Sequence, residues 1–119
     1  MEDTESIPAS RREQQAARFR QLTDMAPDTP MGQLLRQFWH PVAISRNVAP
    51  GTARAVTLMG EQYALYRGQS GQAHLVTNRC AHRRTHLHTG WVEGDQLRCM
   101  YHGWKFDGSG QCVDRPAER

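Results

Sequence analysis

The chain has 119 residues, of which 38% are hydrophobic and 23% charged, and its formal net charge is +3. This length allows one domain with a modest core, and the composition argues against a disordered chain. Apolar runs are far shorter than the roughly 20 residues that cross a bilayer, and the acidic start has no apolar stretch behind it. We therefore expect a cytoplasmic protein with no membrane partner.

Two further features of the composition concern partners and redox state. Arginine and lysine are scattered rather than gathered in a stripe, which argues against nucleic-acid binding. Three cysteines are an odd count, and two of them lie close to histidines. This favours metal ligation in a reducing compartment over a disulfide framework.

Two helices are expected before the first strand. Residues 11–24 have a weak apolar stripe. Thr29 followed by Pro30 is typical of an N-cap with proline at the first helical position. The apolar residues that follow have helical spacing and predict a short helix ending before Pro41: Met31, Leu34, Leu35 and Phe38.

From residue 42 onward, short strands and turns dominate. The pattern predicts strands at residues 42–48, 53–59, 61–67 and 72–78, and another around Cys112. Hairpin turns are predicted at residues 59–62, 68–71 and 106–110. The fold is therefore expected to be mainly β, with residues 80–90 and 99–104 in loops at strand ends.

Those two loops carry candidate metal ligands. The pattern is Cys80-x-His82, sixteen intervening residues, and Cys99-x-x-His102, so each loop offers one thiolate and one imidazole. A Rieske [2Fe-2S] cluster needs two thiolates on one iron and two imidazoles on the other. Zinc also accepts such a set, but its sites usually pair Cys with Cys and His with His. The mixed pairing favours the cluster and leaves zinc as the alternative.

The residues around these ligands carry a family resemblance over residues 25–117. The chain resembles Rieske non-haem iron oxygenases, specifically the phthalate-dioxygenase-like alpha subunits. It departs from them at Arg84, where many have Gly, and at Ala81, where Pro is common. The segments that carry the resemblance are residues 78–84, 98–108 and the lead-in at residues 29–41.

The resemblance implies an N-terminal Rieske domain of small antiparallel sheets, at residues 29–119, preceded by a partly helical or flexible segment at residues 1–28. It implies the electron-transfer domain of an aromatic-ring hydroxylating or demethylating oxygenase, which passes electrons from a flavin-dependent reductase or a ferredoxin to a mononuclear Fe(II) in a catalytic domain or subunit. No histidine follows His102, so we expect that catalytic domain to be absent and the chain to be a fragment, a split subunit or a truncated product. The family also implies a homo-oligomer, a trimer.

Two other functions stay open at this point. One is a stand-alone Rieske ferredoxin that carries electrons without catalysis, although the lead-in helix favours the oxygenase. The other is a zinc-binding interaction module, which metal analysis would distinguish. If the site binds a Rieske cluster, we expect Cys80 and Cys99 to hold the buried iron and His82 and His102 to hold the outer one.

Several neighbours of the ligands have expected roles. Arg83 either stabilises the reduced cluster or docks a carboxylate partner, unless it forms an ordinary surface ion pair. Trp104 and Trp91 are expected to shield the cluster in a packed shell. The remaining expectations are exposed loop positions for His86 and His88 and a buried strand position for Cys112.

The reduction potential is expected in the lower half of the Rieske range, which runs from about −150 to +300 mV. Respiratory Rieske proteins, which the second loop also resembles, place a Ser and a Tyr hydroxyl near the cluster, where this chain has Trp104 and Phe106. They also link their two loops by a disulfide, where this chain has Thr85 and Tyr101. Hydrogen bonds to the sulfurs raise such potentials, so their absence favours a low value.

Overall fold

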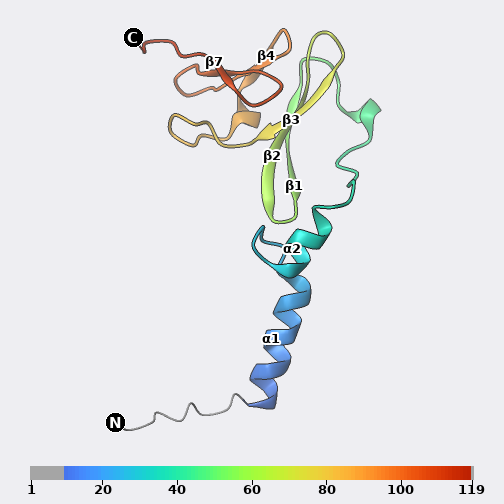
Figure 1. Cartoon of the computed structure of the whole chain (residues 1–119). Coiled ribbons are helices and arrows are strands. Elements are labelled where there is room, and N and C mark those ends of the chain that lie inside the picture. Colours follow the sequence, from blue (N-terminus) through green and yellow to red (C-terminus); the bar gives the residue numbers. More distant parts are fainter. Residues whose placement is uncertain (1–9, 119) are drawn as a thin grey trace, which may run out of the picture. The chain divides into compact units, whose positions relative to one another are not determined.

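Two units make up the chain, Met1–Trp39 and His40–Arg119, and the computed structural model describes residues 10–118 (Figure 1). Of the described elements, both α-helices lie in the first unit and all strands in the second. No helix among these residues has the length and apolar character needed to cross a membrane. The boundary expected between residues 28 and 29 stays a prediction.

Helix α1, Arg11–Thr23, begins with a capping box and confirms the first predicted helix. The Glu13 N–H donates to Ser10 Oγ at 3.3 Å, and the Ser10 N–H donates to Glu13 Oε2 at 2.6 Å. None of its residues is buried in the described structure. Tertiary packing within the described residues therefore contributes little to this helix, and the cap fixes where it begins.

Helix α2, Pro30–Leu35, starts as predicted, with Thr29 as N-cap and proline at its first position. It is shorter than the apolar pattern indicated, because Phe38 lies in a turn and is largely exposed. The Arg36 guanidinium donates to the carbonyl oxygens of Met25 and Gly32, at 2.8 and 3.0 Å. The last turn is thus capped by a side chain before the apolar stripe ends.

The first sheet is an antiparallel meander of β1 (Ala53–Leu58), β2 (Glu61–Arg67) and β3 (Ala73–Thr77). Met59 and Gly60 join β1 to β2 with positive φ angles of 50° and 77°, as the two central residues of a tight hairpin require. These three strands and both of their turns confirm the prediction.

The strand predicted at residues 42–48 is wrong. Part of this segment forms a single 3₁₀ turn, η1 (Ser45–Asn47), and none of it pairs with a strand. The Arg67 guanidinium donates to the carbonyl oxygens of Ser45 and Val48. A side chain from β2 therefore satisfies backbone acceptors that the prediction had assigned to a neighbouring strand.

The second sheet has the order β4-β5-β6-β7, with all neighbours antiparallel. Its strands are β4 (Trp91–Glu93), β5 (Gln96–Arg98), β6 (Lys105–Phe106) and β7 (Cys112–Asp114). The final strand around Cys112 and the hairpin before it were predicted. The other three strands were missed because two or three residues are too few to show alternation.

Buried side chains from both sheets form one core in the second unit. Tyr66 is fully buried in β2, and its hydroxyl donates to the Asp95 carbonyl oxygen in the turn between β4 and β5 at 2.9 Å. Burial raises the pKa of Tyr66 to about 12. The mainly β fold is confirmed, and its core includes two of the candidate ligands: Ala64, Tyr66, Val76, Cys80, Leu87, Leu97, Cys99 and Phe106.

Candidate metal centre

The two ligand loops have the same backbone design. The first, residues 80–85, follows β3, and the second, residues 99–104, joins β5 to β6. In each loop the cysteine N–H donates to the carbonyl oxygen five residues later, Cys80 to Thr85 and Cys99 to Trp104, both at 2.8 Å. Each loop also has a left-handed residue at its fifth position, with φ of 60° at Arg84 and 79° at Gly103. The two loops are thus structural equivalents that differ in where the histidine stands.

Arg84 occupies a conformation that favours glycine. We expect Arg84→Gly to raise the free energy of unfolding by about 0.5–1 kcal/mol, since relief of the left-handed strain exceeds the added freedom of the unfolded chain. The measurement is the thermal midpoint of the cluster-loaded protein, followed by visible circular dichroism.

The matched control is Arg83→Gly, which removes the same charge at a position without positive φ. It is expected to lower the thermal midpoint or leave it unchanged. An equal rise in both variants would mean that charge, and not backbone strain, is the cause.

The two thiols of the loops lie together in the core. Cys80 and Cys99 are each 2% exposed, and neither forms a disulfide. Burial raises the pKa of the Cys80 thiol, and the adjacent Cys99 thiol raises it further, while the backbone N–H groups of His82 and Arg83 lower it. Two adjacent buried sulfurs, one of which receives backbone N–H groups, are suited to bind a metal as thiolates, because the positive metal replaces the proton.

The two imidazoles of the loops also converge. The ring centroids of His82 and His102 are 4.6 Å apart, with the rings inclined at 71°. Within the described part of the chain, the buried Nδ1 of His82 has no hydrogen-bond partner. A buried polar atom without a partner needs an explanation, and a metal ligand supplies one. The donor set of two sulfurs and two imidazoles therefore fits a [2Fe-2S] cluster.

Aromatic rings border the imidazoles. Trp104 stacks on His82 with centroids 4.5 Å apart and planes at 11°, and the Tyr101 ring lies 3.8 Å from that of His102. Trp91 does not belong to this shell, contrary to the prediction. It is 49% exposed, and its indole N–H donates to Glu93 at 2.9 Å.

A partly buried arginine anchors the second loop, and sequence reasoning missed it. Arg98 donates through Nε and Nη2 to the two carboxylate oxygens of Glu93, both at 2.9 Å, and through Nη1 to the Gly103 carbonyl oxygen. Nη1 also contacts Asp114 at 3.2 Å. Hydrogen bonds from Arg98 are the main cause that lowers the pKa of Glu93 to about 2. The available signal was that Arg98 directly precedes Cys99 in the chain.

A second anchor holds the first loop. Asn78 is fully buried, and its side-chain oxygen accepts the His88 N–H at 2.9 Å, while its amide lies 2.9 Å from His88 Nδ1. The expected exposure of His86 and His88 is therefore wrong: both are half-buried, and His88 is bound to the end of β3. The packing of a neighbouring loop, which spacing does not reveal, accounts for this.

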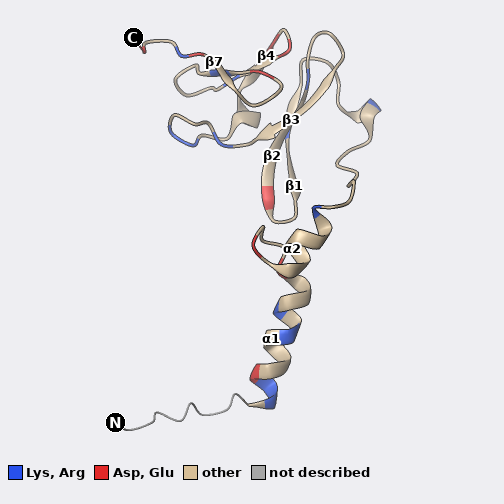
Figure 2. Cartoon of the chain, viewed as in Figure 1, with Lys and Arg blue, Asp and Glu red and all other residues tan. Residues whose placement is uncertain are grey.

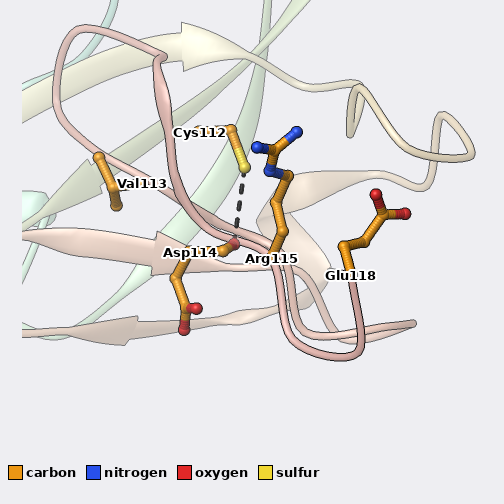
Figure 3. A pocket seen from close by; sticks show the side chains of 5 residues that line it. All are labelled: Cys112, Val113, Asp114, Arg115 and Glu118. Carbon is orange, nitrogen blue, oxygen red and sulfur yellow. Dashed lines mark hydrogen bonds between the residues drawn. The ribbon is translucent and has the colours of Figure 1, made fainter.

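Two other predicted residues lie outside the centre. Arg83 is exposed and forms no ion pair with any residue between positions 10 and 118. Within these residues, the surface ion pair considered for Arg83 is therefore not formed. Cys112 is only partly buried, because it begins the last strand, and its thiol lies 3.5 Å from the Asp114 carbonyl oxygen. Figure 3 shows it beside Arg115 and Glu118 in an open hollow.

Comparison with known proteins identifies the family. The model of the Rieske [2Fe-2S] domain matches residues 38–119. The chain belongs to the Rieske [2Fe-2S] domain family. Its cofactor is accordingly a Rieske-type [2Fe-2S] cluster, and the zinc alternative is not supported.

Relatives of this Rieske domain are oxygenase subunits. It is 45% identical over 82% of its length to the 5,5'-dehydrodivanillate O-demethylase oxygenase subunit of Sphingobium sp. (strain NBRC 103272 / SYK-6), covering 23% of that protein. The phthalate 4,5-dioxygenase oxygenase subunit of Pseudomonas putida is 39% identical over 76% of the chain, which covers 21% of that protein. The predicted relationship to phthalate-dioxygenase-like alpha subunits is confirmed.

A solved structure agrees with this assignment. Dicamba monooxygenase bound to dicamba is 32% identical, with a TM-score of 0.66, over 71% of this chain and 26% of that one. The Rieske domain thus spans about a quarter of the length of the relatives that it matches.

Proposed function

We propose that Cys80, His82, Cys99 and His102 hold the cluster, with both thiolates on one iron and both imidazoles on the other. The observation that supports this assignment is the pairing of the two thiols and of the two imidazoles across two equivalent loops, with a buried imidazole nitrogen left without a partner in the described residues. When bound, the cluster accepts and releases one electron. The four residues supply its ligands, and the surrounding hydrogen bonds and solvent exposure set its reduction potential.

The site has an inner and an outer side. Both cysteines are in the core, whereas His82 is half-buried and His102 is exposed. The imidazole side therefore lies nearest to solvent. This supports entry and exit of electrons through the histidines and a structural role for the two sulfurs, which join the loops to both sheets.

In this proposal the domain is the electron-transfer part of an aromatic-ring oxygenase. A flavin-dependent reductase or a ferredoxin reduces the cluster, which passes electrons to a mononuclear non-haem iron in a catalytic domain or subunit. The support is similarity to oxygenase subunits of a demethylase and a dioxygenase. An oligomer and a cytoplasmic location are proposed on the same ground.

The test combines composition with ligand spectroscopy. The purified 119-residue chain should contain two irons and two acid-labile sulfides, and pulsed electron paramagnetic resonance of the reduced protein should detect two imidazole nitrogens. His82→Cys and His102→Cys should each remove one nitrogen coupling. His86→Cys, at a histidine just after the first loop, is the matched control and should keep both. Retention of both couplings in a His82 or His102 variant would overturn the assignment.

The potential of the cluster provides a separate prediction. Neither Phe106 nor Trp104 carries a hydroxyl group, so neither donates an O–H hydrogen bond to the sulfurs, and Phe106 is buried in the core. We expect a midpoint in the lower half of the range of about −150 to +300 mV, and a value above roughly +150 mV at pH 7 would contradict this. Phe106→Tyr should raise the midpoint by tens of millivolts if its hydroxyl reaches a sulfur, whereas Phe106→Leu should leave it nearly unchanged.

A further inference from the structure

An unbalanced positive charge lies beside the candidate cluster. The first loop and the residue before it carry Arg79, Arg83 and Arg84, all exposed, which we call the basic rim. No Asp or Glu occurs anywhere between residues 62 and 92. The loop that follows β3 accordingly appears blue in Figure 2. The nearest carboxylate along the chain, Glu93, is already engaged by Arg98.

The basic rim has no internal compensation. Neither the Arg83 nor the Arg84 side chain forms an ion pair with a residue between positions 10 and 118, and the Arg79 guanidinium donates only to the Arg84 carbonyl oxygen, at 3.3 Å. Arg84 also stands at a left-handed position, where an arginine is less favourable than a glycine. Uncompensated charge and backbone strain at the same place indicate that these arginines serve a function other than stabilising the fold.

The second loop contributes a different surface to the same region. Met100 and Tyr101 are 55% and 59% exposed, and His102 is exposed beside them. Because His82 and His102 are in contact, the basic rim and this apolar surface border the same pair of imidazoles. An apolar centre with a charged edge is the usual composition of a small protein interface.

We propose that the basic rim binds an acidic electron-donor protein, one with carboxylates around a reduced iron–sulfur centre. This inference rests on the proposed function. The donor centre loses one electron and the Rieske cluster gains it, with no bond made or broken. A diffusing donor gains from electrostatic steering, which accelerates association by about 10- to 1,000-fold, whereas an acceptor held in the same stable assembly does not need it. The charge therefore favours the donor over the acceptor as the occupant.

The experiment measures the reduction rate of the cluster-loaded chain by an acidic plant-type [2Fe-2S] ferredoxin in a stopped-flow instrument. The ferredoxin potential of about −400 mV makes the reaction favourable. Arg83→Gln with Arg84→Gln should lower the second-order rate constant at low salt by about tenfold or more. Added salt should slow reduction of the wild type but scarcely affect the double variant, which lacks the two charges. The reason is that the Debye length falls from about 30 Å at 0.01 M ionic strength to about 8 Å at 0.15 M, so that charges act over a shorter range.

The matched control is Arg46→Gln with Arg54→Gln, which removes two exposed charges from the same unit that belong to neither ligand loop. It should retain nearly the wild-type rate. Arg83→Gln alone should reduce the rate partly and avoids any effect of altering the left-handed position. Equal slowing in both double variants, or no slowing in either, would overturn the proposal.

Two measurements distinguish failure of the docking proposal from failure of the proposed cluster ligands. Dithionite reduction should give the same Rieske spectrum and nearly the same midpoint in every variant, so that a rate change reports docking and not driving force. A normal spectrum with unchanged ferredoxin kinetics rejects the basic rim alone. A wild-type chain without a Rieske spectrum rejects both proposals.

Discussion

Replacement of Gly90 by alanine is expected to lower the free energy of unfolding by about 3 kcal/mol and the thermal midpoint by roughly 10–25 °C. A Cβ at this position would overlap the Arg98 carbonyl oxygen and lie 2.9 Å from the carbonyl carbon. These are backbone atoms, which cannot rotate away. The φ of Gly90 is −79°, a value open to any residue, so the effect comes from overlap alone.

This overlap also reaches the metal centre. Gly90 directly follows η2 (Leu87–Thr89), and Arg98 is the residue before Cys99. Relief of the overlap requires the segment that follows the first loop to move away from Arg98, the last residue of β5, which directly precedes Cys99. We therefore expect Gly90→Ala to bind less iron and sulfide per chain, measured together with its thermal midpoint.

Gly94→Ala is the matched control. Gly94 has a positive φ of 59°, but a Cβ there would meet nothing within 4 Å. Its expected loss is about 1 kcal/mol, from backbone strain alone, with iron content unchanged. If the Gly90 variant is no less stable than the Gly94 variant, the close packing of Gly90 against β5 is not what stabilises the site.

Arg98→Met is expected to accelerate cluster loss by about 10- to 100-fold, the usual effect of removing a group that orients metal ligands. The variant loses the hydrogen bond that fixes the Gly103 carbonyl oxygen, next to His102, and leaves the Glu93 carboxylate without its main partner. The arginine side chain is only 16% exposed, so water replaces these bonds poorly. The measurement is iron transfer to an added chelator below the thermal midpoint of the variant.

Two further variants show whether faster cluster loss in Arg98→Met comes from the loss of ligand positioning or only from lower protein stability. Arg67→Met also removes an arginine that binds several backbone carbonyls, but these are near Ser45 and Gly71, away from the ligand loops. It should lower the thermal midpoint without faster cluster loss. Arg98→Lys should give an intermediate rate, because one ammonium cannot bind both carboxylate oxygens and the loop carbonyl as a guanidinium does. Equal cluster loss in Arg98→Met and Arg67→Met would remove the positioning role.

The sequence allowed prediction of those features that repeat over several residues. Strands β1, β2 and β3 are five to seven residues long and bounded by turn residues, so alternation and turn chemistry identified them. The type of cofactor was also predicted, from ligand types and spacing, since few metal sites use one thiolate and one imidazole from each of two loops. The assignment of the four individual ligands stays a prediction.

Features that depend on distant partners were not predictable in this way. The segment at residues 42–48 has the composition of a strand, but Arg67 binds its carbonyls and it forms a turn. The equivalence of the two loops was hidden, because glycine occupies the left-handed position in one and Arg84 occupies it in the other. The bonds from Arg98 to Glu93 and to the Gly103 carbonyl likewise join residues that a single sequence does not relate.

Cys80 and Cys99 are part of the core that joins the two sheets. If they bind the cluster as proposed, the stability of the domain depends on the supply of its cofactor. A chain that has not received its cluster keeps two buried thiols at the centre of a small domain, without the metal bonds that would hold them. Binding energy of this kind is folding energy. In a cell short of iron or sulfide, quality-control proteases would then remove the chain, and its abundance would follow cluster assembly as closely as it follows transcription.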